Sequence, residues 1–198
     1  MKNFLIVLIL CLMLPTVVMA QDEVGSFELP QYQMGSQMFT FRAGPVIPLF
    51  VYFPYDNSPI ETDTHMKTGG YGSIRYQGFT NSQLALGGEL GYYFAYSQSD
   101  LFTSVPVQFS MSWIPVQGTV ELPISLGLGF AYNSYDQSSY LSMFASFEVG
   151  LSWYFTDSWG ITLSAGYWLI PELYSSEKKT DTAIANTMPI ILSVNYRD

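Results

Sequence analysis

The 198-residue chain contains one cysteine, one histidine and only seven lysines and arginines, against 16 aspartates and glutamates. A single cysteine excludes a disulfide scaffold and a cysteine-based structural zinc site. A single histidine excludes a histidine-cluster metal site, so the sequence predicts neither a metal nor a cofactor. The net charge of -9 argues against a nucleic-acid partner, because phosphate binding requires a basic surface.

Long hydrophobic runs are also scarce, although 48% of the residues are hydrophobic. Residues 1–20 have the pattern of a cleaved signal peptide, with Lys2 before an apolar run that ends at Leu14 and a small-residue cleavage site at Ala20. The alternative is a membrane anchor, but the run is shorter than the about 20 residues that a spanning helix needs. Cys11 lies within the run, so the mature chain would lack cysteine.

Beyond about residue 35, apolar and polar residues alternate with a period of two, which is typical of β-strands. The predicted strands cover residues 36–44, 70–78, 83–96, 102–114, 119–132, 140–155, 159–170 and 183–196. Short turns alternate with mostly longer loops, the latter at 45–69, 97–101, 133–139 and 171–182. This pattern predicts an all-β fold, an eight-stranded antiparallel up-and-down transmembrane β-barrel over residues 36–198, preceded by a periplasmic lead-in at 21–35.

The charges decide which face of the strands points outward. Five charged residues lie within the predicted strands. All of them occupy the alternate positions that face away from the bulky apolar side chains: Arg42, Arg75, Glu89, Glu121 and Glu148. A water-facing surface should be about 25–35% charged, and the interior of an eight-stranded barrel admits mainly small side chains. The apolar face is therefore expected to contact lipid, and the five charges to form a network in the lumen. Counted from the turns, Glu121 should lie nearer the short-turn end and the other four at mid-depth.

Two interpretations of that lumen network follow from the residues. Charges of opposite sign in a low-dielectric lumen should pair, because isolated buried charge is costly. We expect a structural plug, since eight strands leave little free bore. The alternative is an ion gate or selectivity element.

Aromatic residues concentrate near both ends of the predicted strands. Those beside the short turns are Trp113, Trp153, Phe155, Trp159 and Tyr196, and those beside the long loops are Tyr92, Phe94, Tyr96, Phe130, Tyr132 and Tyr167. Two aromatic girdles around an aliphatic band are typical of a bilayer-spanning barrel. The alternative is that tyrosine and tryptophan simply favour strands.

The segment between Pro45 and Pro54 is unusually apolar for a loop. It contains Val46, Ile47, Leu49, Phe50, Val51, Tyr52 and Phe53, and three prolines that argue against a regular central strand. One interpretation is a hydrophobic ligand entrance or partner-binding patch. The other is a lid over the barrel mouth or a continuation of the first strand.

These features together resemble the small eight-stranded outer-membrane barrels of Gram-negative-type bacteria, including OmpA-, OmpX- and OmpW-type proteins and some spirochaete barrels. The resemblance covers about residues 36–196. The apolar stretch after Gly44 favours the OmpW-like proteins, which use such a stretch near a hydrophobic ligand opening. The chain departs from the pattern at its end, where Arg197 and Asp198 follow the aromatic Tyr196. The resemblance implies residence in the outer membrane among its lipids, and insertion by the barrel-assembly machinery.

Three functions are open at this point. The first is an OmpW-like barrel that binds or passes small hydrophobic molecules. The second is a structural or adhesin-like barrel that meets host or surface ligands through acidic loops containing Asp56, Glu61, Asp63, Asp100, Asp136, Glu172 and Glu177. The third is a lipid-modifying enzyme using His65, which is disfavoured because no nucleophile motif accompanies that residue. The sequence therefore predicts a non-enzymatic protein.

Overall fold

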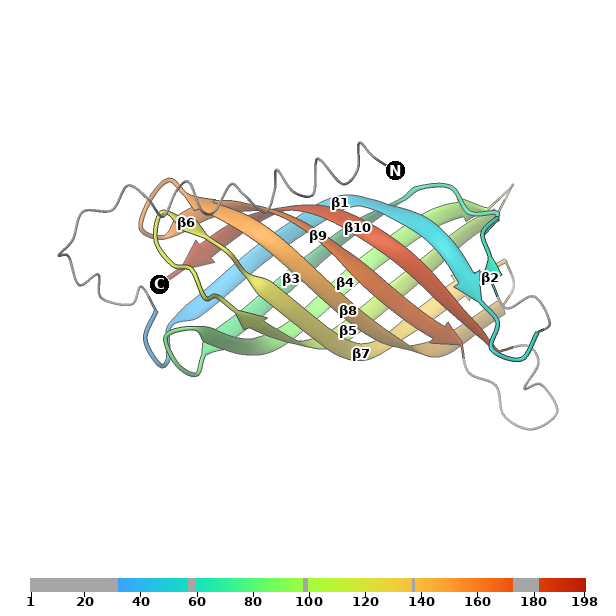
Figure 1. Cartoon of the computed structure of the whole chain (residues 1–198), viewed down its shortest axis with the longest axis horizontal. Coiled ribbons are helices and arrows are strands. Elements are labelled where there is room, and N and C mark those ends of the chain that lie inside the picture. The colour runs from blue at the N-terminus through green and yellow to red at the C-terminus, as the bar shows by residue number, and fades with distance from the viewer. Residues whose placement is uncertain (1–31, 57–59, 98–99, 137, 173–181) are drawn as a thin grey trace.

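The computed structural model describes residues 32–56, 60–97, 100–136, 138–172 and 182–198. The predicted signal peptide, most of the lead-in and Glu177 lie outside these ranges. Long antiparallel strands close into a single barrel (Figure 1), which confirms the predicted all-β, eight-stranded fold. Among the described residues, no helix is both long and apolar enough to cross a membrane.

The barrel wall consists of β1 (Gln37–Tyr52), β3 (Gly69–Phe79), β4 (Leu84–Ser97), β5 (Asp100–Trp113), β7 (Ile124–Tyr135), β8 (Ser138–Tyr154), β9 (Trp159–Glu172) and β10 (Ala183–Arg197). The short β2 (Ile60–Glu61) pairs with the end of β1, and the short β6 (Val120–Glu121) pairs with β8. Consecutive wall strands pair with each other, and β1 pairs with β10, side by side in Figure 1, to close the barrel. Closure gives each wall strand two neighbours, as a bilayer requires of a spanning sheet.

The two ends of the barrel differ in their connections. Short turns join β3 to β4 and β8 to β9 at the end where the C-terminus lies, on the left in Figure 1, and we term this the turn end. The Asn81 side-chain oxygen accepts hydrogen bonds from the backbone amides of Gln83 and Leu84, both at 2.8 Å, which stabilises the first turn. The Thr156 hydroxyl accepts a bond from the Trp159 amide at 2.9 Å in the second. The opposite end is termed the loop end.

The strands extend further toward the loop end than the sequence predicts. Strand β4 reaches Ser97 and β5 begins at Asp100, so most of the predicted loop at 97–101 belongs to strands. Strand β7 likewise reaches Tyr135, and β8 begins at Ser138. The sequence pattern stops where polar residues replace the apolar ones, so the predicted strands end there. The strands themselves continue, because backbone hydrogen bonds across a hairpin do not depend on the type of side chain. The predicted strand 119–132 is wrong in a different way, because it is divided into β6 and β7 around Pro123.

The apolar segment after Pro45 continues β1 as far as Tyr52, but as an irregular strand that lies mostly at an edge and not as a regular central one. Pairing of β1 with β3 ends at Val46, and farther along β1 keeps β10 on one side and only the short β2 on the other. Pro48 adjoins a register shift in the pairing with β10. Proline is tolerated at edges and bulges, where the missing amide donor leaves no acceptor unpaired.

Alternation in the wall separates two environments. Leucine, phenylalanine and tryptophan side chains cover the outer face, and Leu128 and Leu141 are 66% and 67% exposed. The charged residues in the middle of the strands are all buried and point inward: Arg42, Arg75, Glu89 and Glu148. The barrel is therefore apolar outside and polar inside, the reverse of a water-soluble domain.

Candidate functional site in the barrel lumen

Four charged side chains from different strands meet in the middle of the lumen, and they are termed the central charge cluster: Arg42 (β1), Arg75 (β3), Glu89 (β4) and Glu148 (β8). Arg75 and Glu89 are paired directly across β3 and β4, and Arg75 Nε lies 2.7 Å from Glu89 Oε2. Arg75 Nη2 lies 3.4 Å from Glu148 Oε2. Arg42 contacts both carboxylates with its two terminal nitrogens. Each guanidinium therefore bridges both carboxylates.

Neutral donors complete the coordination of the two carboxylates. Glu89 accepts hydrogen bonds from the Tyr71 hydroxyl at 2.7 Å, the Ser73 hydroxyl at 2.6 Å and Gln108 Nε2 at 3.1 Å. Trp168 Nε1 donates to Glu148 Oε1 at 3.1 Å. Buried charges persist only when they are paired and hydrogen-bonded, and this cluster satisfies both conditions while carrying no net charge.

An aromatic plug, formed by Tyr71, Tyr93, Phe144 and Trp168, fills the lumen next to the cluster on its loop side. The Trp168 ring lies edge-on to Tyr71, with centroids 4.7 Å apart, and to Phe144 at 5.3 Å. All four side chains are buried. Met66, from the segment between β2 and β3, packs against the same apolar cluster. This plug was not predicted from the sequence, although β3, β4, β8 and β9 each carry one of these large aromatic residues at an inward-facing position.

A second closure, termed the turn-end cover, lies at the other mouth and consists of Tyr32, Glu121, Tyr154 and Arg197. Arg197 pairs with Glu121, and its guanidinium carbon lies 3.6 Å from the Tyr154 ring centroid. The Tyr32 hydroxyl donates to Glu121 Oε2 at 2.8 Å, and the Tyr32 ring stacks on Phe79 at 3.8 Å. Burial raises the pKa of Tyr32 above its ordinary value, so its hydroxyl stays protonated and remains a donor.

The cover changes two expectations drawn from the sequence. The sequence puts Arg42, Arg75, Glu89 and Glu148 at mid-depth and Glu121 nearer the short turns, within one network. In the structure the first four meet one another, whereas Glu121 pairs with Arg197 at the turn end. Arg197 follows the outward-facing Tyr196 and therefore points inward, so the atypical end of the chain supplies a charge to the lumen. Tyr32, assigned to a periplasmic lead-in, is packed inside the barrel mouth.

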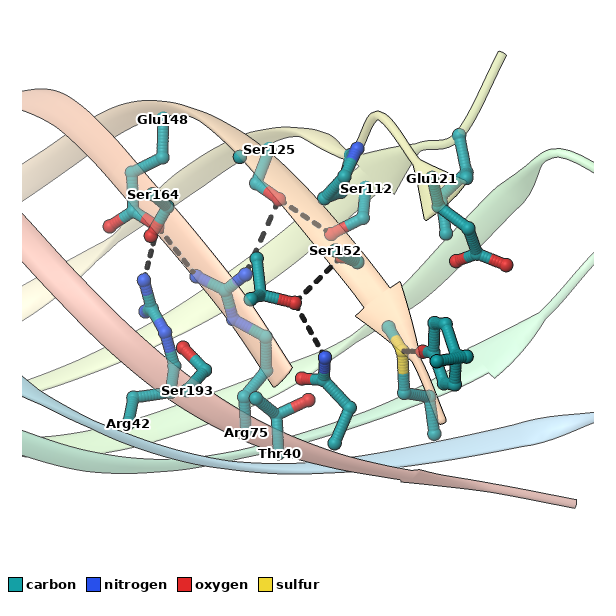
Figure 2. A pocket seen from close by; sticks show the side chains of 17 residues that line it. Thr40, Arg42, Arg75, Ser112, Glu121, Ser125, Glu148, Ser152, Ser164 and Ser193 are labelled. Carbon is teal, nitrogen blue, oxygen red and sulfur yellow. Dashed lines mark hydrogen bonds and ion pairs between the residues drawn. The ribbon is translucent and has the colours of Figure 1, made fainter. Parts of the chain in front are cut away.

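Between the central charge cluster and the turn-end cover lies a small polar chamber of about 40 Å³. Figure 2 shows serine and threonine side chains lining it, with Arg42, Arg75 and Glu148 on one side and Glu121 on the other. A water molecule needs about 10–15 Å³ on the same measure, so the chamber has room for a few waters.

The apolar segment of β1 is part of the barrel wall at its loop end. Val46 is fully buried within the apolar cluster around the aromatic plug. Ile47, Leu49, Phe50, Val51 and Phe53 are half-buried, and Tyr52 is exposed at the strand end. The backbone of this segment pairs with β10, which corresponds to the strand-continuation interpretation and not to a lid.

The predicted aromatic girdles lie on the outer surface. Ten of the eleven residues are exposed: Tyr92, Phe94, Tyr96, Trp113, Phe130, Tyr132, Trp153, Phe155, Trp159 and Tyr196. Tyr167 is half-buried, because its hydroxyl donates to Asn186 Oδ1 on β10. The outer wall thus carries aromatic side chains toward both ends.

The remaining candidate, His65, lies in the exposed segment between β2 and β3. Its Nδ1 is 3.3 Å from Asp63 Oδ1, and its backbone amide donates to the same carboxylate at 3.1 Å. The contact is a local turn at the surface. Within the described ranges, no group of three or more His, Cys, Asp or Glu side chains is arranged to hold a metal ion.

Solved structures of outer-membrane barrels share this fold. Neisserial surface protein A superposes with a TM-score of 0.59 at 14% identity, covering 82% of this chain and 96% of the other. Ail, the attachment invasion locus protein of Yersinia pestis, gives a TM-score of 0.50 at 14% identity, covering 84% of this chain and 100% of the other. Ail in complex with the heparin analogue sucrose octasulfate gives 0.51 at 15% identity over the same shares. These likenesses show the fold, which is that of small outer-membrane β-barrels.

Sequence relatives come from spirochaetes. An uncharacterised protein of Borreliella burgdorferi is 27% identical over 172 residues, covering 75% of this chain and 79% of the relative. One from Treponema pallidum is 26% identical over 112 residues, covering 56% of this chain and 51% of the relative. A model of a spirochaete protein family matches residues 19–196. The chain therefore belongs to this spirochaete family, and it has the fold of a small eight-stranded outer-membrane β-barrel.

Proposed function

We propose that this outer-membrane barrel is closed to solutes and acts at the cell surface, where its acidic loop end binds positively charged partners. The filled lumen is the observation that supports the proposal most strongly. A solute crossing the barrel would have to pass the aromatic plug, the central charge cluster and the turn-end cover in turn. The barrel then serves as a rigid anchor for the segments at its loop end, in the structural or adhesin-like role weighed above.

The loop end supplies the charge for such a role. Its exposed carboxylates are Asp56, Glu61, Asp63, Asp100 and Asp136. Among the described residues of this end, Lys67 is the one lysine or arginine. Exposed aromatics such as Tyr55 and Tyr135 lie among these carboxylates in the sequence. A surface with one sign of charge attracts partners of the opposite sign and speeds their association.

The negative charge of the loop end also predicts a different ligand from that of Ail, one of the structural neighbours. Ail has been solved with sucrose octasulfate, a polyanion. An acidic loop end would repel such a ligand, because like charges across an interface are unfavourable. We therefore expect the surface ligand of this protein to be cationic, with basic protein segments as the class that fits.

The structure supports the passage of small hydrophobic molecules less well than it supports a surface role. Such a route needs an apolar path, whereas the chamber below the aromatic plug is lined largely by hydroxyl and charged groups. The apolar segment of β1, which favoured this function, is incorporated in the wall. A lipid-modifying reaction at His65 has no support from its exposed surroundings, and we propose a non-enzymatic role.

The proposal includes the route to the membrane. Residues 1–20 would direct export and be removed, leaving a short periplasmic lead-in from residue 21 to the packed Tyr32. The closed apolar wall would then be inserted by the barrel-assembly machinery and surrounded by outer-membrane lipids. Short turns face the periplasm in such barrels and longer loops face outward, so the loop end is the exposed one.

Binding of fluorescent oligolysine to intact cells tests the surface role. Reversal of two exposed charges at the loop end, Glu61→Lys with Asp100→Lys, should weaken binding at least about fivefold, because each exposed charge pair contributes about 0.2–1 kcal/mol and reversal adds repulsion. Asp157→Lys, at the turn end, is the matched control and should bind like the wild type. Binding by the wild type should fall as salt rises.

Two results would overturn the proposal. Equal binding by the wild type and the doubly reversed variant, at equal surface amounts, would remove the acidic loop end as the binding surface. Stepwise conductance of the wild-type protein in planar bilayers would show that the barrel is open.

A further inference from the structure

The outer wall of the barrel carries a recess across β7, β8 and β9, which we term the β8 groove. It is open to the outside and has a volume of about 240 Å³. Six outward-facing side chains line it: Leu126, Leu128, Ala145, Phe147, Tyr167 and Leu169. None of these residues belongs to the lumen or to the acidic loop end, so the groove is separate from the proposed surface role.

The recess forms because a small residue occupies a position surrounded by large ones. Ala145 is paired with Leu128 on β7 and with Leu169 on β9, and Phe147 follows it on the same face of β8. Side chains at directly opposed positions of neighbouring strands lie next to each other. Ala145 is half-buried while Leu128 protrudes at 66% exposure, so the alanine forms the floor and its neighbours form the walls.

The strand pairing changes at the same place. The ladder between β8 and β9 ends at the pair of Ala145 with Leu169. Farther toward the loop end, β8 pairs only with β7 and the last residues of β9 pair only with β10. The groove therefore lies where two wall strands part. It does not open into the lumen, because Trp168 of the aromatic plug stands behind this part of the wall, paired with Ser146.

The chemistry of the groove is apolar. The Tyr167 hydroxyl is engaged with Asn186 Oδ1. The Ser146 hydroxyl, at the back of the groove, donates to Gln108 Oε1 in the lumen at 2.9 Å. Both hydroxyl groups of the lining are thus already bonded within the protein. An occupant would find methyl, methylene and ring carbon atoms and no polar anchor.

We propose that the β8 groove binds one acyl chain of an outer-membrane lipid. The groove lies in the lipid-facing wall, so hydrocarbon chains are the medium that reaches it. A second barrel would meet this wall as one convex surface against another, and protruding Leu128 and Phe147 would hold it away from the floor at Ala145. A flexible chain is narrow enough to enter. The volume is adequate, since an apolar cavity of about 150 Å³ holds a benzene molecule.

Native mass spectrometry of the full-length protein, purified in detergent and supplied with palmitoyl-oleoyl-phosphatidylglycerol, tests this site. The wild type should retain one lipid per barrel. Ala145→Phe fills the groove floor and should lower the apparent lipid affinity about tenfold, a difference that corresponds to about 1.4 kcal/mol. Ala165→Phe is the matched control, because Ala165 is an exposed alanine on β9 that also faces lipid but lies outside the groove. That variant should retain lipid like the wild type.

Folding of each variant is checked by the heat-dependent shift of the barrel in gel electrophoresis, and Ala145→Leu provides a smaller filling change if the phenylalanine variant does not fold. Equal lipid retention by the wild type and a folded Ala145 variant would overturn the proposal. A dimer in the wild type that disappears in the Ala145 variant would also overturn it, because the groove would then bind a second copy of this chain.

Discussion

At the scale of single residues, the lumen depends on charges that neutralise one another. Arg42 and Arg75 each reach both carboxylates of the central charge cluster. Removing one member leaves the others buried with an excess of one sign. Removing one charge destabilises the folded state by more than the intact ion pair stabilises it, because the remaining charge stays buried and keeps its desolvation penalty.

Glu89→Gln tests this dependence with little change in side-chain volume. We expect a loss of about 3–5 kcal/mol in the free energy of unfolding, since two arginines would then share one carboxylate. Urea unfolding in lipid vesicles measures the change. Asp100→Asn removes an exposed carboxylate and serves as the control, with an effect within about 0.5 kcal/mol. Equal urea midpoints for Glu89→Gln and the wild type would show that the cluster contributes no net stability.

At the scale of strands, the positions of proline and glycine determine how closely the wall strands approach. Pairing between β4 and β5 skips the positions around Pro106, and pairing between β9 and β10 skips those around Pro189. A proline has no amide hydrogen, so each interrupts one ladder without breaking the strand. Glycine acts differently at the closing seam, where a Cβ on Gly44 would lie 2.0 Å from the Ile190 carbonyl oxygen of β10.

Gly44→Ala should therefore disturb the seam between β1 and β10. The added methyl group would collide with backbone, which cannot rotate away, and we expect a destabilisation of about 1–3 kcal/mol. Gly88→Ala is the control, because the nearest atom to a Cβ there is 3.8 Å away. The two urea midpoints should differ clearly, and a Gly44→Ala barrel as stable as Gly88→Ala would mean that the seam is looser than the structure indicates.

At the scale of the whole molecule, the barrel is closed by elements from far apart in the chain. The turn-end cover joins Tyr32, from the N-terminal side, to Arg197, next to the C-terminus, through Glu121. The loop end carries five exposed carboxylates and Lys67, whereas Asp157 and Asp198 are exposed at the turn end. The two ends therefore present different surfaces. The orientation of the barrel in the membrane determines which end is exposed outside the cell.

Trypsin treatment of intact cells tests this orientation. Lys67 is exposed at the loop end, so a fragment that ends at this residue should appear if the loop end faces outward. The variant Lys67→Gln should lose that fragment together with its counterpart that begins at Thr68, and keep the products of other cleavage sites. Arg197 is buried at the turn end and should be protected. Release of the fragment only after the outer membrane is permeabilised would place the loop end in the periplasm.

Much of the fold was predictable from the sequence because alternation is a local property. A period of two, read over segments such as residues 141–155, predicts a strand and separates its two faces without reference to any neighbour. The scarcity of charge then assigns the apolar face to lipid. Strand ends were less predictable, since β1 continues through prolines and β7 through polar residues where pairing with a neighbour maintains the strand.

Alternation along the strands and the scarcity of charge are thus enough to predict the class of fold, the outward apolar face and the inward charges. They do not predict which charges meet: Glu121 pairs with Arg197, and the other four lie together. Alternation assigns a side chain to a face of the sheet, whereas its partner depends on strand register and on depth in the barrel, which exist only once the eight strands have closed. The same holds for the β8 groove, where one alanine becomes a recess only through its neighbours on two other strands.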